Sequence, residues 1–421
     1  MAFFRKAADI FALDIGSSSV KALQLREAGG SYRLTALGTA SLPPEAIADG
    51  SIKDAPTVIE AIRSSVSKAG IKARESAIAI SGRELIIKKV QIPEVPPRDV
   101  HPVVQLEAEH HIPFAIDEVF LDYHTVGQHG GVMDLILVAV KKSKVLEYAS
   151  VVSEAGFTPS IVDVDGFALA NQFELNFPEE RGEAVALIDI GASTMKTNVV
   201  RAGATIFARD IPFGGNNYTQ AIAQQLKIPF EQAEAAKLGR DVGVRWEAVV
   251  PALEAVSREL SLEVQRTFDY FASTAESERI GRIVLAGGCS LLPGLNDYLA
   301  SNWGIPVELA RPFARVEVDP AYGEEVNAAG PALAVAVGLG LRRPGDKGKR
   351  SGSIWRPRRS DGGASAFRRS RSRASTSARF SPSCTWSRSS GPWPTGGRSP
   401  WRSGTSRARS PRASESSRSS R

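Results

Sequence analysis

The 421-residue sequence is poor in cysteine, histidine and methionine, and it has no long apolar run. Its two cysteines, Cys289 and Cys384, exclude a disulfide framework and a cysteine-rich zinc site, and they favour a reducing, cytoplasmic setting. The five histidines lack the spacing of a zinc protease. The longest apolar run, at 332–341, is roughly half of a membrane span, and Asp9 and Asp14 interrupt any apolar signal segment. We therefore expect membrane association to be peripheral or through a partner.

The charge is divided unequally along the chain. Residues from Gly345 onward carry 19 of the 52 lysines and arginines but 3 of the 46 acidic residues, which leaves positions 1–344 with a net charge of −10. From Arg350 on, arginine, serine, glycine and proline dominate, and there is no leucine, valine or lysine. We expect residues 345–421 to be disordered, since no periodic core can be drawn from this composition.

Two explanations of this tail are open. Its 17 arginines from Arg350 onward could bind a nucleic-acid backbone without sequence preference. Alternatively, a GC-rich gene translated out of frame gives this composition, which lies far outside that of soluble proteins. We favour a frameshift or a misassigned end, and nucleic-acid binding is not expected of the acidic body.

The central feature of the sequence is an eight-residue pattern that occurs twice, 175 positions apart. The copies, Asp14-Ile15-Gly16-Ser17-Ser18-Ser19-Val20-Lys21 and Asp189-Ile190-Gly191-Ala192-Ser193-Thr194-Met195-Lys196, share five residues in register. Each copy follows an apolar run and precedes a further strand-like segment, so each predicts a β-hairpin with a carboxylate at the end of its first strand. One such turn alone is usually an ordinary hairpin, but the duplication indicates a shared function.

The chemistry of these turns suits a nucleotide. Successive backbone N–H groups and hydroxyls in a turn can bind a phosphate, and a carboxylate suits a hydrated Mg²⁺ ion. Two copies therefore predict two halves of a protein that close on one nucleotide.

Apolar periodicity divides the rest of the chain into an α/β plan. Strands are predicted at 10–15, 20–25, 31–41, 76–80, 160–165, 184–190, 197–200, 204–211, 280–285 and 307–309, and helices at 55–69, 166–175, 218–226, 230–238, 251–275, 293–301 and 330–341. Residues 85–159 differ in texture: strands at 86–90, 119–126 and 133–140 alternate with a Pro-rich stretch and with helices at 103–111 and 143–155. We interpret them as a small α+β module inserted into the first unit.

The predicted domains follow from this plan. Residues 1–85, 160–182 and 331–344 form the first α/β domain, and residues 86–159 form the inserted module. Residues 183–330 form the second domain, with its helical part at about 215–278, and 345–421 is the tail.

The two hairpins and a Gly-Gly turn after a late strand resemble the actin, heat-shock ATPase and sugar-kinase superfold, in which ATP lies between two related α/β domains. Further motifs resemble the PilM family, the actin-like cytoplasmic components of type IV pilus assembly. They are Glu107-Ala108-Glu109, Ile112-Pro113-Phe114, Glu118-Val119, Pro212-Phe213-Gly214-Gly215, Arg311-Pro312-Phe313-Ala314 and the closing segment 331–339. The resemblance covers residues 1–346. The chain is similar also to FtsA, whose inserted module occupies the same place.

The resemblance implies an ATP site with Mg²⁺. Asp14 and Asp189 would hold the metal ion through waters, and Lys21 would reach a phosphate. The remaining expected nucleotide contacts are Gly16, Ser17, Ser18, Ser19, Gly191, Ala192, Ser193, Thr194, Gly214, Gly215, Glu234, Lys237, Gly287, Gly288 and Cys289. Glu234 and Lys237 share one helical face and would contact ribose and adenine; without the superfold they would be a solvated surface pair. Gly287 and Gly288 would let the backbone approach the adenosine.

Asp165 lies where the superfold places the group that orients the attacking water, so we assign it as the catalytic candidate. The other interpretation is that Asp163 or Asp165 serves as the N-cap of the helix that begins at Gly166. Whether ATP is hydrolysed or only held stays open at this point.

By resemblance, the main function is assembly. Proteins of the PilM family lie at the cytoplasmic face of the inner membrane, where a groove between the first domain and the inserted module takes the N-terminal segment of PilN. Ile86–Val90 and Val119–Tyr123 are the expected lining of that groove, and the motor ATPases of the pilus are further expected partners. The alternatives are an FtsA-like membrane-associated filament protein and a small-molecule kinase of the same superfold.

Overall fold

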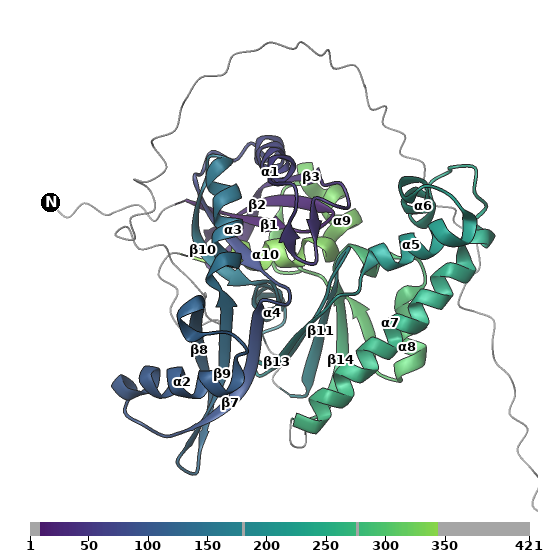
Figure 1. Ribbon diagram of the computed structural model, residues 1–421. Helices are drawn as coiled ribbons and strands as arrows, with labels where there is room; N and C mark the ends of the chain where they lie inside the picture. Colours follow the sequence, from purple (N-terminus) through teal and green to yellow (C-terminus); the bar gives the residue numbers. More distant parts are fainter. Residues whose placement is uncertain (1–8, 179–181, 275–277, 344–421) are drawn as a thin grey trace, which may run out of the picture.

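The computed structural model describes residues 9–178, 182–274 and 278–343. These residues form two mixed β-sheets, each built around one of the repeated hairpins, and a smaller antiparallel sheet attached to the first (Figure 1). The tail 345–421 and the predicted helix end at Ala275 lie outside the described residues. No helix among the described residues is long and apolar enough to cross a membrane.

The first sheet has six strands in the order β10-β6-β1-β2-β3-β16. They are β1 (Ile10–Ile15), β2 (Ser19–Ala28), β3 (Ser31–Ser41), β6 (Glu75–Ile80), β10 (Thr158–Val164) and β16 (Val316–Val318). Side chains of β1 alternate between two cores: Phe11 and Leu13 face one, and Ile10 and Ala12 face the other. Because the sheet is covered on both faces, β1 is apolar at successive positions, apart from Asp14 near its end.

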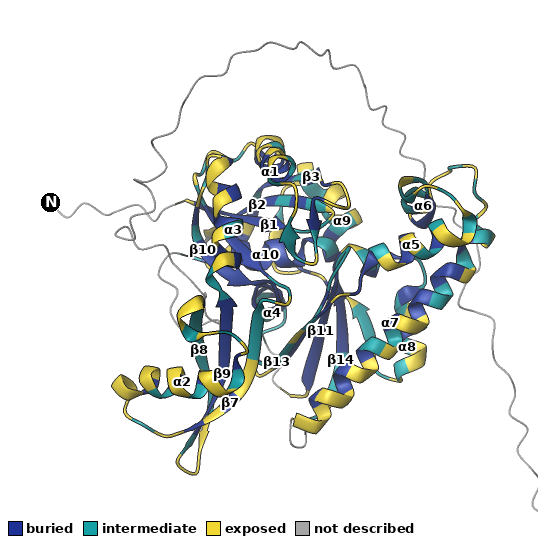
Figure 2. Cartoon of the chain, in the orientation of Figure 1, coloured by how far each residue is buried: buried dark blue, intermediate teal, exposed yellow. Residues whose placement is uncertain are grey.

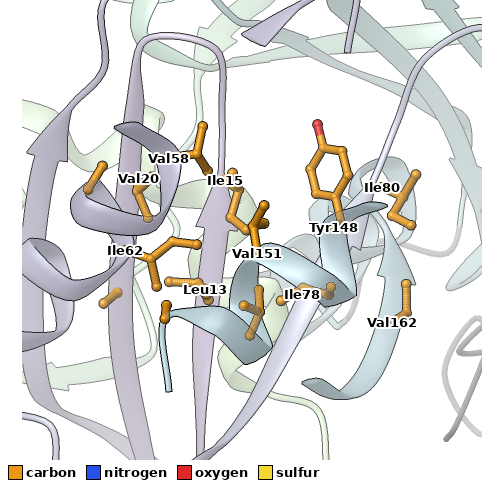
Figure 3. Close-up of a cluster of buried hydrophobic side chains, with 14 of the residues drawn as sticks. Leu13, Ile15, Val20, Val58, Ile62, Ile78, Ile80, Tyr148, Val151 and Val162 are labelled. Atoms are coloured by element: carbon orange, nitrogen blue, oxygen red, sulfur yellow. The ribbon is translucent and has the colours of Figure 1, made fainter. Parts of the chain in front are cut away.

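Helices cover both faces of this sheet. α1 (Ala55–Ala69) and α3 (Lys142–Glu154) pack on one face, where Leu13, Ile62 and Val151 meet (Figure 3). α4 (Asp165–Asn176) and α10 (Ala334–Gly340) lie on the other. α1 begins where the Asp54 side chain accepts a hydrogen bond from the Thr57 N–H, and it ends at Gly70, whose φ of 64° stops the helix.

The second sheet has five strands in the order β13-β12-β11-β14-β15. They are β11 (Ala184–Ile190), β12 (Met195–Arg201), β13 (Ala204–Ile211), β14 (Ile280–Ala286) and β15 (Val307–Leu309). Its helices are α5 (Gly215–Leu226), α6 (Phe230–Lys237), α7 (Trp246–Thr274) and α8 (Leu295–Trp303). α7 buries one face, with Leu253, Leu260 and Phe271 in the core, because its apolar residues recur with helical spacing.

The inserted module is a three-stranded antiparallel sheet in the order β7-β9-β8, with α2 against one face. Its elements are β7 (Leu85–Pro93), α2 (Pro97–His111), β8 (Val119–His129) and β9 (Val132–Lys141). The short elements are β4 (Ile47–Ala48), β5 (Ser51–Ile52), α9 (Gly323–Ala329) and the 3₁₀ turns Ile116–Glu118, Gly288–Leu291, Pro320–Tyr322 and Gly330–Leu333. Figure 2 shows that β9 is buried while much of α2 is exposed.

α4 is the central helix because it packs against both large sheets. Phe167 and Ala168 belong to the two cores of the first sheet, while Leu169 packs with Val185 of the second. α10 crosses α4 so closely that a Cβ on Gly338 would lie 1.7 Å from the Ala168 carbonyl oxygen. The small residues near the end of the sequence therefore serve a close helix crossing.

Four predictions need correction. α2 begins at Pro97 and not at Val103, and α7 begins at Trp246 and not at Pro251, so each helix continues through an internal proline, Pro102 or Pro251. The segment 330–341 is a 3₁₀ turn followed by the shorter α10. β16 pairs with β3, so the chain rejoins the first sheet at Val316, whereas the sequence prediction assigned residues up to 330 to the second domain.

Replacing Gly338 tests the helix crossing. We expect Gly338→Ala to lower the melting temperature strongly, with a loss of stability on the order of 3 kcal/mol, because the backbones of α4 and α10 would have to separate. Gly323→Ala is the control, since a Cβ there meets nothing within 4 Å. Equal thermal stability of the two variants by circular dichroism would contradict the close crossing.

Candidate functional site

Each repeated hairpin contains the same buried ion pair. Asp14 lies directly opposite Lys21 in the β1–β2 pair, and Lys21 Nζ is 2.9 Å from Asp14 Oδ2. Asp189 lies opposite Lys196 in the β11–β12 pair, and the corresponding distance is also 2.9 Å. Both aspartates are buried, with exposed fractions of 8% and 5%. The sequence repeat therefore places the same Asp–Lys ion pair in both hairpins.

The two hairpin turns touch each other. Ser193 Oγ lies 2.8 Å from Ser17 Oγ, which joins the first sheet to the second at this point. Within the turns, the Gly16 N–H donates to the Ser19 carbonyl over 3.1 Å and the Gly191 N–H to the Thr194 carbonyl over 3.0 Å. The structure thus brings together the residues predicted for both halves of the nucleotide site.

Asp165 lies in the same cluster. Its Oδ2 is 3.1 Å from Lys196 Nζ, so that ammonium contacts Asp165 and Asp189 together. Burial disfavours the charged form of Lys196, but the carboxylates of Asp189, Asp165 and Asp14 outweigh that cost and hold its pKa well above the ordinary value. We call Asp14, Lys21, Asp165, Asp189 and Lys196 the hairpin cluster.

Neither aspartate caps α4, so that alternative is wrong. The helix begins at Asp165 itself, after Val164, and no side chain makes a cap hydrogen bond there. Asp163 is fully buried and paired with Arg342 from the end of the described chain. Burial raises the pKa of Asp163 against the lowering effect of Arg342. Asp163 therefore has a structural partner, whereas Asp165 faces the hairpin cluster.

The Gly-Gly turn before α5 is packed against the second hairpin. A Cβ on Gly214 would lie 2.6 Å from the carbonyl oxygens of Ala192 and Gly191. The N–H groups of Gly215 and Asn216 donate to those same two carbonyls over 2.9 and 2.7 Å. The first turn of α5 thus fixes the shape of the hairpin turn, and glycine is required by close backbone contact.

Glu234 and Lys237 are not a free surface pair. Lys237 is 7% exposed, and its Nζ lies 2.6 Å from Glu234 Oε2. It also donates to the Gly215 carbonyl over 3.1 Å and contacts Thr219 Oγ1 at 2.9 Å. α6 is thereby tied to the start of α5, next to the second hairpin.

Cys289 lies at the same place. A Cβ on Gly215 would be 3.6 Å from that of Cys289 and 3.3 Å from Lys237 Nζ. Burial raises the pKa of the Cys289 thiol to about 11, against the lowering effect of Lys237. The thiol is therefore protonated at neutral pH, which disfavours a nucleophilic role.

Gly287 is closely surrounded by other atoms, whereas Gly288 is not. Gly287 has a φ of 85°, and a Cβ there would lie 2.4 Å from the Ile190 carbonyl oxygen and 2.5 Å from Asp189 Oδ1. Contact with the second hairpin therefore already requires glycine at position 287. A Cβ on Gly288 meets nothing within 4 Å, and this residue is exposed.

Sequence reasoning missed two members of the site. Lys196 was part of the repeat but was not assigned a role. Asp210 lies opposite Lys196 in the β12–β13 pair and accepts a hydrogen bond of 2.7 Å from the Gly82 N–H. Burial raises the pKa of Asp210 to about 6, against the lowering effects of Gly82 and Lys196. The register between β12 and β13 was the signal that could have found it.

The side chains of the hairpin cluster fit a hydrated Mg²⁺ ion only in part. Asp14, Asp165 and Asp189 supply carboxylate oxygens, which Mg²⁺ prefers. Yet each of these carboxylates already has a lysine ammonium within 3.1 Å. No three acidic, histidine or cysteine side chains among the described residues are arranged to bind a metal ion directly. A metal ion would therefore have to bind through waters, in competition with two lysines.

The inserted module borders two hollows on opposite edges of its sheet. Ile86–Lys89 of β7 line a groove of about 1030 Å³, whose other wall is formed by β13 and α7. Val119–Leu121 of β8 line a separate cavity of about 720 Å³ over α2. The predicted lining segments Ile86–Val90 and Val119–Tyr123 thus border two different hollows, at the two edge strands of the module's sheet.

The two sheets and the paired hairpins define an actin-like fold. The chain matches the family described as type IV pilus assembly protein PilM over residues 12–344, and it therefore belongs to that family. The solved structure of a PilM–PilN type IV pilus biogenesis complex aligns with a TM-score of 0.73 and 27% identity, covering 81% of this chain and all of that one.

The chain is also similar to cell division protein FtsA. The protein from Streptococcus pneumoniae is 25% identical, with 75% of this chain and 78% of that protein aligned. The one from Pseudomonas aeruginosa is also 25% identical, covering 75% and 85%. The resemblance that the sequence motifs indicated is thus confirmed for the family and for the fold.

Protonation of Asp210 gives a pH test of the site. Because its folded pKa is raised from 3.8 to about 6, the associated stability is fully present below pH 3.8 and is lost as the pH rises through 6. Asp210→Asn keeps an acceptor for the Gly82 N–H without the charge. Between pH 5 and pH 7.5, we expect the free energy of unfolding of the variant to rise relative to that of the wild type. The expected rise is roughly 1 kcal/mol after allowance for solvent screening. A constant difference in melting temperature over this range would contradict the raised pKa.

Proposed function

We propose that the protein is a nucleotide-binding scaffold of the type IV pilus machine, the apparatus of twitching motility. It would act at the cytoplasmic face of the inner membrane and link the membrane assembly complex to the motor ATPases. Membership of the PilM family supports the pilus assignment. The observation that carries nucleotide binding is the contact between the two hairpin turns, Ser17 and Ser193, each beside a buried Asp–Lys pair.

In this proposal ATP lies between the hairpins. Gly16–Ser19 and Gly191–Thr194 hold the phosphates through backbone N–H groups and hydroxyls, with Lys21 as a charged contact. Ribose and adenine lie toward Glu234 and Lys237, beside Gly214, Gly215, Gly287, Gly288 and Cys289. Asp14 and Asp189 hold Mg²⁺ through waters, and Asp165 is the candidate general base. The two lysines suit the phosphates of this ligand, and the carboxylates suit its hydrated Mg²⁺ ion.

We further propose that the β7–β13 groove takes the N-terminal cytoplasmic segment of PilN. Both strands are edge strands, so each has free backbone groups that an extended peptide can pair with. Phe207 and Tyr270 supply an apolar wall, and Tyr270 is 49% exposed. Thr194 and Asp210 also line the groove, so it touches the second hairpin. This contact would couple nucleotide binding to peptide binding.

Two other functions of the same fold compete with this proposal. An FtsA-like filament protein is supported by the similarity to FtsA, which concerns the fold. A small-molecule kinase would need an acceptor site with its own base, and the sequence contains no acceptor motif. A coupled assay of ADP release against a panel of sugars and acetate distinguishes a kinase from a scaffold, because a scaffold shows no acceptor-dependent release.

Nucleotide retention tests the hairpin assignment. We expect Asp14→Ala to lose bound ATP, with an affinity at least about tenfold weaker, because Lys21 loses its orienting partner. Asp9→Ala is the matched control, since Asp9 is exposed and its distance to Arg26 is 3.4 Å. Titration with a fluorescent ATP analogue measures both. If the folded Asp14 variant binds ATP as tightly as the control, the assignment of this hairpin is wrong.

Peptide binding tests the β7–β13 groove. We expect Tyr270→Ala to weaken binding of a labelled PilN N-terminal peptide about tenfold or more, as removal of a central aromatic contact does in other interfaces. Leu262→Ala, on the same helix α7 and 58% exposed, is the control. His101→Ala reports on the α2–β8 cavity. If only His101→Ala loses binding, the peptide binds in that cavity and not in the β7–β13 groove.

Fluorescence anisotropy of the labelled PilN peptide tests the coupling between the nucleotide site and the groove. We expect the PilN peptide to bind ATP-loaded and nucleotide-free protein with different affinities, because Asp210 and Thr194 belong to both the groove and the hairpin region. Equal affinities would show that the two sites are independent.

A further inference from the structure

The two hairpins are alike in their Asp–Lys pair but differ in what else the lysine contacts. For Lys21, the structure records one ion pair among the described residues, with Asp14. Lys196 contacts two carboxylates, Asp189 at 2.9 Å and Asp165 at 3.1 Å. The repeat thus gives an internal comparison between a lysine that contacts one carboxylate and a lysine that bridges two.

Lys196 lies between two carboxylates with different proposed roles. Asp189 is the carboxylate proposed to hold the metal ion, and Asp165 is the one proposed to activate water. The side chains of Lys196, Asp165 and Asp189 are 14%, 12% and 8% exposed, so little water reaches the space among them. The single ammonium is therefore shared by both carboxylates at short range, in an environment where such ion pairs are strong.

We propose that Lys196 is a built-in cation that makes this site hold ATP without turning it over. This inference rests on the proposed nucleotide site. The ammonium engages the Asp165 oxygen that would accept a proton from water, and it supplies positive charge beside Asp189 that a metal ion would otherwise provide. The nucleotide then serves as a lasting structural ligand that joins the two sheets, and its binding depends weakly on Mg²⁺.

The reaction that Lys196 would suppress is the hydrolysis of ATP by water. The oxygen of a water molecule attacks the γ-phosphorus of ATP, and the bond from that phosphorus to the β,γ-bridging oxygen breaks. A proton of the water passes to Asp165 Oδ2, and ADP leaves with the electron pair of the broken bond. Asp165 can accept that proton only when its oxygen is not engaged by Lys196.

The first experiment measures thermal stability with Mg²⁺ alone, without nucleotide. Lys196→Met keeps an unbranched side chain, one atom shorter, and removes its charge, so Asp165 and Asp189 are left as two buried carboxylates without their shared cation. We expect its melting temperature to fall by several degrees and to recover by about half or more in 10 mM MgCl₂, because the metal ion binds where the ammonium was. Wild type should shift by less than about 1 °C.

The second experiment measures ATP affinity with Mg²⁺ or EDTA and single-turnover hydrolysis of bound ATP. We expect wild type to bind ATP about equally well in both conditions and to hydrolyse it slowly. Lys196→Met should need Mg²⁺ for binding and hydrolyse bound ATP at least about tenfold faster, since general-base catalysis contributes a factor of this size or more. Lys196→Arg should behave like wild type, because it keeps the charge.

Lys21→Met is the matched control from the other hairpin. It should weaken ATP binding without raising the hydrolysis rate of the ATP that is bound, because Lys21 pairs with Asp14 and not with Asp165. If Lys196→Met does not yield folded protein, the double variant Lys196→Met with Asp165→Asn removes one of the two stranded charges. That variant should bind ATP with Mg²⁺ and stay hydrolytically slow, since the base is absent.

The outcomes separate the two claims. If wild type binds no ATP under any condition, the proposed nucleotide site fails. If wild type binds ATP but Lys196→Met shows neither a Mg²⁺-dependent recovery nor faster hydrolysis, the role of Lys196 fails and the nucleotide site stands. Faster hydrolysis in the double variant would likewise overturn the role of Asp165 in this account.

Discussion

The structure depends on how two buried carboxylates are neutralised. Asp14 and Asp189 lie at the ends of the first strands of two related hairpins, and each is paired with the lysine directly opposite. A buried carboxylate without a cation or hydrogen-bond donors is costly, so the pairing is a condition of the fold as well as of the site. Because Ser17 and Ser193 bring the two turns into contact, the paired charges come together at one place between the sheets.

The surrounding packing preserves this geometry. Gly214 and Gly287 allow backbone to approach the second hairpin at distances that no side chain would permit, and Gly338 allows α10 to cross α4. α4 in turn connects both sheets and carries Asp165 at its first residue, beside Lys196. The site is therefore built on helices and strands of the two large sheets. The inserted module, which would recognise a partner, projects from the first domain and presents β7 and β8 as its edge strands (Figure 1).

The sequence predicted the hairpins, the family and most of the elements, because strict apolar periodicity and a duplicated motif are strong local signals. It could not predict which long-range contacts satisfy a given charge. Lys196 was visible as part of the repeat, but its contact with Asp165 depends on the placement of α4. Asp210 became visible only through the β12–β13 register, and the contact of Gly287 with the second hairpin could not be seen in the sequence. β16 was too short, at three residues, for periodicity to detect.

The central claim is that one nucleotide lies between the two hairpins and contacts both. Hydrogen–deuterium exchange of the full chain, with and without ATP, tests it most directly, because backbone N–H groups that bind phosphate exchange more slowly. The account predicts that peptides covering Gly16–Ser19 and Gly191–Thr194 become protected together, at the same ATP concentration. Protection of only one turn, or of neither while ATP is bound elsewhere, would contradict it.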